Sequence, residues 1–235
     1  MTEGLKELYL QIQRDAHGQE IELGGMKFTT KPVHPVLEPS PECIEVTTLT
    51  GLIDYLKGKV DGLDLGKLVC HVENPTTVTL RSTLTGPFMQ RHEYIRAKAD
   101  LPEMHFVAKL DAEAFNIWVQ SAFVADEHRS LVLKFAANVK STVEGQSLDD
   151  GVSQVVSVRT GIVSVENVVI PNPVRLAPYR TFTEIAQPES DFIFRAHTGN
   201  LFSLTEADGG AWRSDAMQNL KAYIENEIEG LIVIA

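Results

Sequence analysis

Two short acidic turns are the first places in the sequence where chemistry could occur. Asp149 and Asp150 precede Gly151, and Glu206 and Asp208 lie just before a Gly-Gly pair. Carboxylate oxygens gathered at a glycine turn can hold Mg²⁺ or Ca²⁺, so these four acids are the candidate metal ligands. Asp-Gly pairs are also ordinary turn formers, and neither turn has the spacing of an EF-hand loop. The pattern therefore favours turns over a metal site.

A second set of candidate residues lies between residues 172 and 195, where arginines, aromatic rings and prolines occur together. Arginines offer paired donors to a carboxylate or a phosphate, and rings offer faces for stacking. The candidate binding residues are Arg175, Tyr179, Arg180 and Arg195. Alternation turns the nearby phenylalanines inwards, however, and Glu184, Glu189 and Asp191 are close enough in sequence to pair with the arginines. Core rings and ion pairs are therefore the favoured interpretation.

Other catalytic motifs are absent from the sequence. The seven histidines have no HxH, HxxH or HExxH spacing, and there is no GxSxG elbow, P-loop or GxGxxG loop. Cys43 and Cys70 lack CxxC spacing and are expected to be reduced and buried, with a single disulfide between them as the alternative. No catalytic residue and no cofactor is predicted. The interpretation leans away from an enzyme, and a metal-dependent or nucleotide-acting enzyme that uses the acidic turns is the alternative.

Charge and hydropathy narrow the choice of partners. The net charge of −11, from 32 acids and 21 bases, argues against a general binder of nucleic-acid backbones, which needs clustered bases. A role with single-stranded nucleic acid stays as a further alternative, carried by the arginines. No apolar run approaches the roughly 20 residues of a membrane span, and the N-terminus lacks the basic and apolar regions of a signal peptide. We expect an intracellular protein without a membrane partner.

The elements that would position the candidate residues follow from local patterns. Apolar residues recur at i, i+3, i+4 and i+7 from Leu5 to Ile12, which predicts a helix. A hairpin or meander at residues 20–29, around the turn pair Gly24-Gly25, and a proline-rich connector at residues 31–41 are expected to follow. The predicted domains are an N-terminal arm, residues 1–41, and a main domain, residues 42–235. Strands come in groups and do not alternate with crossover helices, so the predicted class is α+β with mostly antiparallel sheet and about four helices. A C-terminal helix followed by a short strand is expected to end the chain.

Two helix caps and one strand are predicted from local signals. Thr50 is predicted to cap a helix that ends near Gly62, and Asp111 to cap a second helix. Residues 131–139 fit either a helix or a strand, and their strict alternation favours a strand. That strand is predicted to pair with residues 153–160 across an acidic loop.

Four blocks of the sequence together resemble the YfdQ-like proteins of phages and prophages, a family of unknown function. The blocks are VENPTTVTLRS at residues 72–82, DDGVSQVVSVRTGI at 149–162, NPVRLAPYRTFTEIAQPESDFIFR at 172–195 and LTEADGGAW at 204–212. The resemblance covers roughly residues 67–223. It implies an origin in a phage or prophage genome, often among early or recombination genes, and a location in the host cytoplasm. It supplies no catalytic residues.

Self-assembly is the expected mode of action. An amphipathic N-terminal helix, an acidic loop and an apolar C-terminal strand each offer a surface for symmetric contact, although each could instead fold back on its own subunit. The expected function is that of a non-catalytic phage accessory protein. It would form a homo-oligomer and act by assembly or by sequestering a partner or ligand, with another phage protein or a host protein as a second kind of partner.

Overall fold

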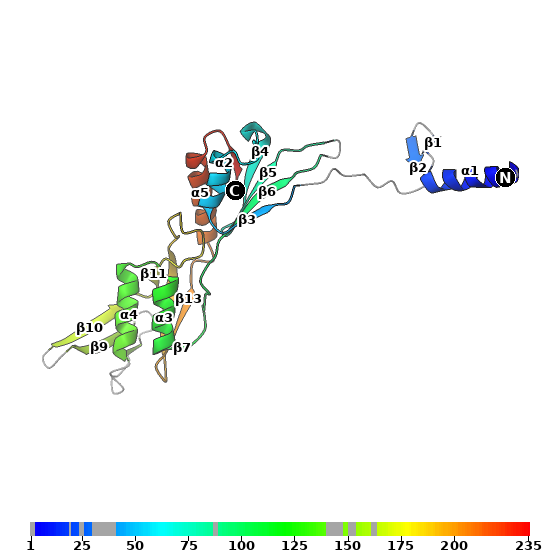
Figure 1. The fold of residues 1–235 in the computed structure, drawn as a ribbon. Coiled ribbons are helices and arrows are strands. Elements are labelled where there is room, and N and C mark those ends of the chain that lie inside the picture. The colour runs from blue at the N-terminus through cyan, green and yellow to red at the C-terminus, as the bar shows by residue number, and fades with distance from the viewer. Residues whose placement is uncertain are drawn as a thin grey trace. The chain divides into compact units, whose positions relative to one another are not determined.

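The computed structural model describes residues 3–18, 20–23, 26–29, 41–86, 89–139, 148–149, 154–160 and 164–235. The chain divides into two compact units, Met1–Ser40 with Thr85–Gln90 and Pro41–Leu84 with Arg91–Ala235. The predicted class is confirmed, because helices and mostly antiparallel sheets occur together and the chain ends with a helix and a short strand (Figure 1). Within the described residues, no helix combines the length and the apolar character needed to cross a bilayer.

The described residues of the first unit form a helix and a pair of strands. Helix α1, Glu3–His17, is the predicted amphipathic helix, and strands β1, Glu20–Leu23, and β2, Met26–Thr29, pair antiparallel. The apolar stripe of α1 is exposed to solvent, with Leu5 and Leu8 both 56% and Ile12 58% exposed. Covering apolar surface is favourable, and the stripe is still exposed. It is therefore a candidate contact surface.

The second unit contains a five-stranded sheet in the order β14-β4-β5-β6-β3. Its strands are β14 (Ile232–Ile234), β4 (Leu68–Asn74), β5 (Thr77–Ser82), β6 (Glu93–Lys98) and β3 (Ile44–Val46). The three central strands are antiparallel, whereas β14 runs parallel to β4 and β3 runs parallel to β6. A short 3-10 helix, η1 (Leu65–Lys67), leads into β4.

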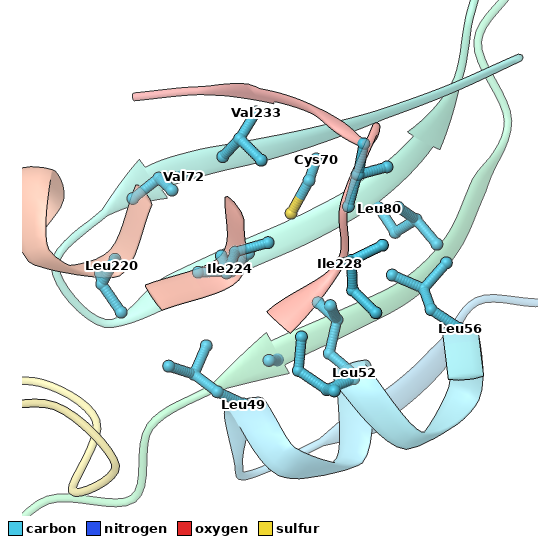
Figure 2. Packing of buried hydrophobic residues seen from close by; sticks show 14 of the residues in the cluster. Leu49, Leu52, Leu56, Cys70, Val72, Leu80, Leu220, Ile224, Ile228 and Val233 are labelled. Carbon is cyan, nitrogen blue, oxygen red and sulfur yellow. The ribbon is translucent and has the colours of Figure 1, made fainter. Parts of the chain in front are cut away.

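One face of this sheet is covered by helices α2, Leu49–Lys57, and α5, Trp212–Glu227 (Figure 1). Strand β4 shows the reason, since Leu68, Cys70 and Val72 alternate with half-buried residues and all point to the same side. Figure 2 shows side chains of both helices meeting Cys70 and Leu80 of the sheet in one apolar layer. Both cysteines are free thiols, Cys70 buried and Cys43 half-buried, so the expected burial holds fully only for Cys70.

The predicted N-cap of α2, Thr50, lies two residues after the observed one. Thr48 is the N-cap residue, and its side chain accepts a hydrogen bond from the Gly51 amide at 3.1 Å. Thr50 lies inside the helix and donates to the carboxylate of Glu184, which is 134 residues away in sequence. A threonine that could cap locally is thus used for a long-range contact, which local patterns do not reveal.

A second core lies around a four-stranded sheet in the order β11-β12-β13-β7. Its strands are β11 (Val174–Leu176), β12 (Ser190–His197), β13 (Leu201–Glu206) and β7 (Leu110–Asp111). Helices α3, Ala112–Ala122, and α4, Glu127–Val139, supply the other side of this core. Asp111 caps α3 as predicted, because its carboxylate accepts from the amides of Glu113 and Ala114.

The predicted strand at residues 131–139 is wrong, because this segment belongs to helix α4. Val132, Phe135 and Ala136 are buried at helical spacing, while Leu131 and Leu133 are only half-buried. The predicted pairing with residues 153–160 is therefore also wrong. Strand β9, Gln154–Thr160, pairs instead with β10, Ser164–Ile170, and with β8, Leu148–Asp149.

Candidate functional site

The stretch from residue 172 to residue 195 joins the two cores of the second unit. Val174 and Phe192 are buried in the second core, whereas Phe182 and Ile185 are buried in the core of the five-stranded sheet. The loop between β11 and β12 is held by Gln187, whose side chain accepts from the amides of residues 180 and 181 and donates to the carbonyl of Phe182 at 2.9 Å. The stretch is thus a folded connection between two cores.

Arg180 lies at the centre of this connection and is only 5% exposed. One end of its guanidinium donates to the carboxylate of Glu206, at the end of β13. The other end donates to the hydroxyl of Ser190 and to the carbonyl of Pro188. Charge-assisted bonds of this kind are the strong ones in proteins, and they offset the cost of burying the charge.

Asp208 extends the same network towards the start of helix α5. Its carboxylate accepts from the Ser190 hydroxyl and, at 2.9 Å, from the amide of Gly210. Gly209 and Gly210 have positive φ angles of 65° and 82°, so the two glycines allow the tight turn that brings this carboxylate back. The indole of Trp212 makes a cation–π contact with Arg180, whose guanidinium lies 4.0 Å from the ring centre.

The electrostatics of the site follow from burial and from the opposite charges. Burial lowers the pKa of Arg180, and the nearby charges of Glu206 and Asp208 act against that shift. Burial disfavours the charged form of Asp208, but hydrogen bonds from Ser190 and Gly210 and the charge of Arg180 outweigh it. The pKa of Asp208 is therefore below its ordinary value.

The structure brings together residues from both predicted sets. Arg180 was a candidate binding residue, and Glu206 and Asp208 were candidate metal ligands. A divalent ion at these two acids would have to compete with Arg180 and Ser190 for the same oxygens, and it would lie beside a positive charge. The described residues contain no group of three or more His, Cys, Asp or Glu side chains arranged to hold a metal. The metal site stays a prediction.

The remaining predicted residues lie apart from this network. Arg175 is exposed and pairs with Glu189 at 2.8 Å, as the favoured interpretation expected. Tyr179 is half-buried and its amide donates to the carbonyl of Ala122, while Arg195 is half-buried on β12. Asp149 forms part of β8, and Asp150 is outside the described residues.

A second polar cluster, on the five-stranded sheet, was not predicted as a site. Arg81 pairs with Glu73 at 2.6 Å and with Glu93 at 2.8 Å, and Arg96 pairs with Glu93 at 2.8 Å. The hydroxyl of Thr79 donates to Glu73 at 2.7 Å, so this carboxylate serves two donors. Two positive and two negative charges balance, and the four side chains are 24–35% exposed, so they form a polar, partly solvated face of the sheet. The signals in the sequence were the polar face of residues 77–83 and the run of charges around residues 91–98.

Comparison with protein-family models, with curated proteins and with solved structures finds no match to this chain. The Arg180 network therefore has to be interpreted from its own geometry. The two terminal nitrogens of the buried guanidinium donate to Glu206, Ser190 and the Pro188 carbonyl, while its Nε has no hydrogen-bond partner within the described residues. A cation whose donors are mostly used by the protein itself is the arrangement of a structural network.

The low pKa of Asp208 predicts how acid affects this network. A carboxylate whose pKa is lowered by folding stabilises the folded state above its unfolded pKa of about 3.9, and this contribution disappears as the pH falls through the lower folded pKa. We expect Asp208→Asn to lower the free energy of unfolding at pH 7. The difference in this free energy between the parent and the variant is expected to become smaller as the pH falls below about 4. Urea unfolding of both proteins between neutral and acidic pH measures this. A difference that is independent of pH would contradict the assignment.

Proposed function

We propose that this chain is a phage- or prophage-encoded accessory protein of the host cytoplasm that self-assembles into a homo-oligomer. It would act by assembly or by sequestering a partner, and not by catalysis. The resemblance described above supports the origin. The observation that supports self-assembly is that strand β14, at the edge of the five-stranded sheet, is apolar and exposed.

Strand β14 differs from the other edge strands of the five-stranded and the four-stranded sheet. Edge strands present unpaired backbone groups, and proteins protect them with charged side chains, prolines or very short length. Strand β3 carries Glu45, strand β11 carries Arg175 and the two-residue strand β7 carries Asp111. Strand β14 has three residues, as β3 and β11 do, but it consists of isoleucine and valine alone.

The side chains of β14 are also placed for a contact. Val233 is only 6% exposed because it points into the core, whereas Ile232 is 51% and Ile234 is 48% exposed. Ile232 is the partner of Val69 in the ladder, so it lies on the sheet face turned away from α2 and α5. An apolar edge strand with exposed isoleucines is stabilised when another strand covers it.

A second copy of the same strand is the simplest partner. Two β14 strands related by a two-fold axis would pair antiparallel and join their sheets, and each copy would contribute the same surface. Helix α1 offers a second self-complementary surface, because a stripe at residues 5, 8, 9 and 12 has the same spacing in either direction. Two such helices can therefore pack antiparallel with their stripes in register.

Light scattering after size-exclusion chromatography at micromolar concentration tests the proposal. We expect the measured mass of the parent protein to be at least twice the monomer mass. The variant with Ile232→Lys and Ile234→Lys places charges on the edge. Its oligomer is expected to dissociate at a protein concentration at least about tenfold higher than the concentration at which the parent oligomer dissociates. Removal of residues 1–33 measures the separate contribution of α1.

The control adds the same two charges at other exposed apolar positions. Val60 is 62% and Val107 is 66% exposed, and lysine at both positions is expected to leave the mass unchanged. A monomeric parent chain, or a lysine variant of β14 that assembles like the parent, would contradict the proposal.

A further inference from the structure

A groove beside helix α3 has features of a small-molecule site. The groove is open to solvent on one side, and its volume of about 430 Å³ is within the range of about 300–1,000 Å³ found for small-ligand sites. One wall is the segment before β7, with Pro102, Glu103 and His105, and the other is α3, with Ala114, Ile117 and Trp118. Both walls belong to the second unit.

Both walls of the groove are held in place by the rest of the protein. The indole of Trp118 is 5% exposed and is held by edge contacts to the rings of Phe106, Phe115 and Phe123 at 5.2–6.0 Å. The opposite wall is fixed to the sheet, because the Val107 amide donates to the Leu204 carbonyl at 2.8 Å. A ligand that entered would therefore not have to order these walls, which lowers the cost of binding.

The walls offer an apolar surface with one negative charge. Ile117 is 61% exposed although it lies within α3, and Ala114 is exposed one turn before it. Of the described residues that line the groove, Glu103 is the one carboxylate, and no lysine or arginine is among them. The Glu103 carboxylate lies 4.0 Å from Nδ1 of His105, whose ring contacts the Trp118 indole edge-on. An anion would be repelled here, whereas a cation would find a partner.

We propose that this groove binds a small organic amine, with its apolar ring on Ile117 and Ala114 and its ammonium group beside Glu103. The net charge of −11 of the chain favours the approach of such a cation. This binding is independent of the assembly proposed above, because β14 contributes no residue to the groove.

Fluorine NMR of the full chain labelled with 5-fluorotryptophan tests the proposal. The sequence has two tryptophans, Trp118 at the groove and Trp212 beside Arg180, so the second signal is an internal control. We expect benzylamine to shift the Trp118 signal saturably, with half-saturation at about 1–10 mM as is usual for a fragment of this size, and to leave the Trp212 signal in place. Benzoate, with the opposite charge, is expected to cause no saturable shift.

Two variants separate the apolar and the charged contributions. Ile117→Ala is expected to weaken benzylamine binding about fivefold or more, whereas the same change at Ile232, which is 51% exposed, leaves it unchanged. Glu103→Gln is expected to weaken it about two- to fivefold, since Glu103 is 85% exposed, and to leave binding of neutral benzyl alcohol unaffected. Absence of a saturable Trp118 shift, insensitivity to Ile117→Ala, or equal binding of benzylamine by Glu103→Gln would each overturn the proposal.

Discussion

Replacement of Arg180 by leucine is expected to lower the free energy of unfolding by about 3–5 kcal/mol, the usual cost of removing one partner from a buried ion pair. Arg180 is 5% exposed, and its loss leaves Glu206 without its cation and removes the donor to Ser190. A carboxylate left in a partly buried place without a partner is strongly unfavourable. Urea unfolding followed by circular dichroism gives the size of the loss.

The same stretch of chain supplies the control. Arg175 pairs with Glu189 on the surface, where the two side chains are 64% and 55% exposed, and Arg175→Leu is expected to cost no more than about 1 kcal/mol. A second variant that combines Arg180→Met with Glu206→Met is expected to recover part of the loss, because it removes both charges of the pair. Equal losses for Arg180→Leu and Arg175→Leu would show that the Arg180 network is not a structural element.

Replacement of Phe194 by alanine is expected to cost about 3–5 kcal/mol, the range for removing a buried phenylalanine ring. Phe194 is 1% exposed, and its ring contacts Phe135 at 5.3 Å and both Phe115 and Phe202 at 5.9 Å. These rings come from α3, α4 and β13, so the cavity left by alanine would lie where three elements meet.

The neighbouring Ile193 provides the comparison for this prediction. It is the next residue on β12 but is only half-buried, so Ile193→Ala is expected to cost less than half as much. Chemical denaturation with tyrosine and tryptophan absorbance in the near-ultraviolet reports on the packing of the second core. A loss for Phe194→Ala no larger than that for Ile193→Ala would contradict the central place of this ring.

Local patterns in the sequence were sufficient for several elements. The inward face of β4 follows from strict alternation, and the cap of α3 follows from an aspartate before a helical stripe. Both depend on residues within a few positions of each other, where backbone geometry decides which side chains share a face. The α+β class follows in the same way, from strands that come in groups.

Helix α4 shows where local patterns stop being sufficient. Leu131, Leu133 and Phe135 alternate like a strand, yet Val132, Phe135 and Ala136 also form a helical stripe. The helix forms because that stripe packs on the second core and because the Asp126 carboxylate accepts from the Arg129 amide at 2.6 Å. Periodicity alone cannot choose between two patterns when both bury apolar residues.

The candidate site shows the same division more sharply. The sequence by itself identified Arg180, Glu206 and Asp208 as residues able to bind ligands, because residue type and neighbours are local properties. That Arg180 meets Glu206, 26 residues further along, was decided by the tertiary structure, which folds β12 and β13 together and places the start of α5 beside them. Ion pairing acts through space, and once the arginine was buried its charge required these acids as partners.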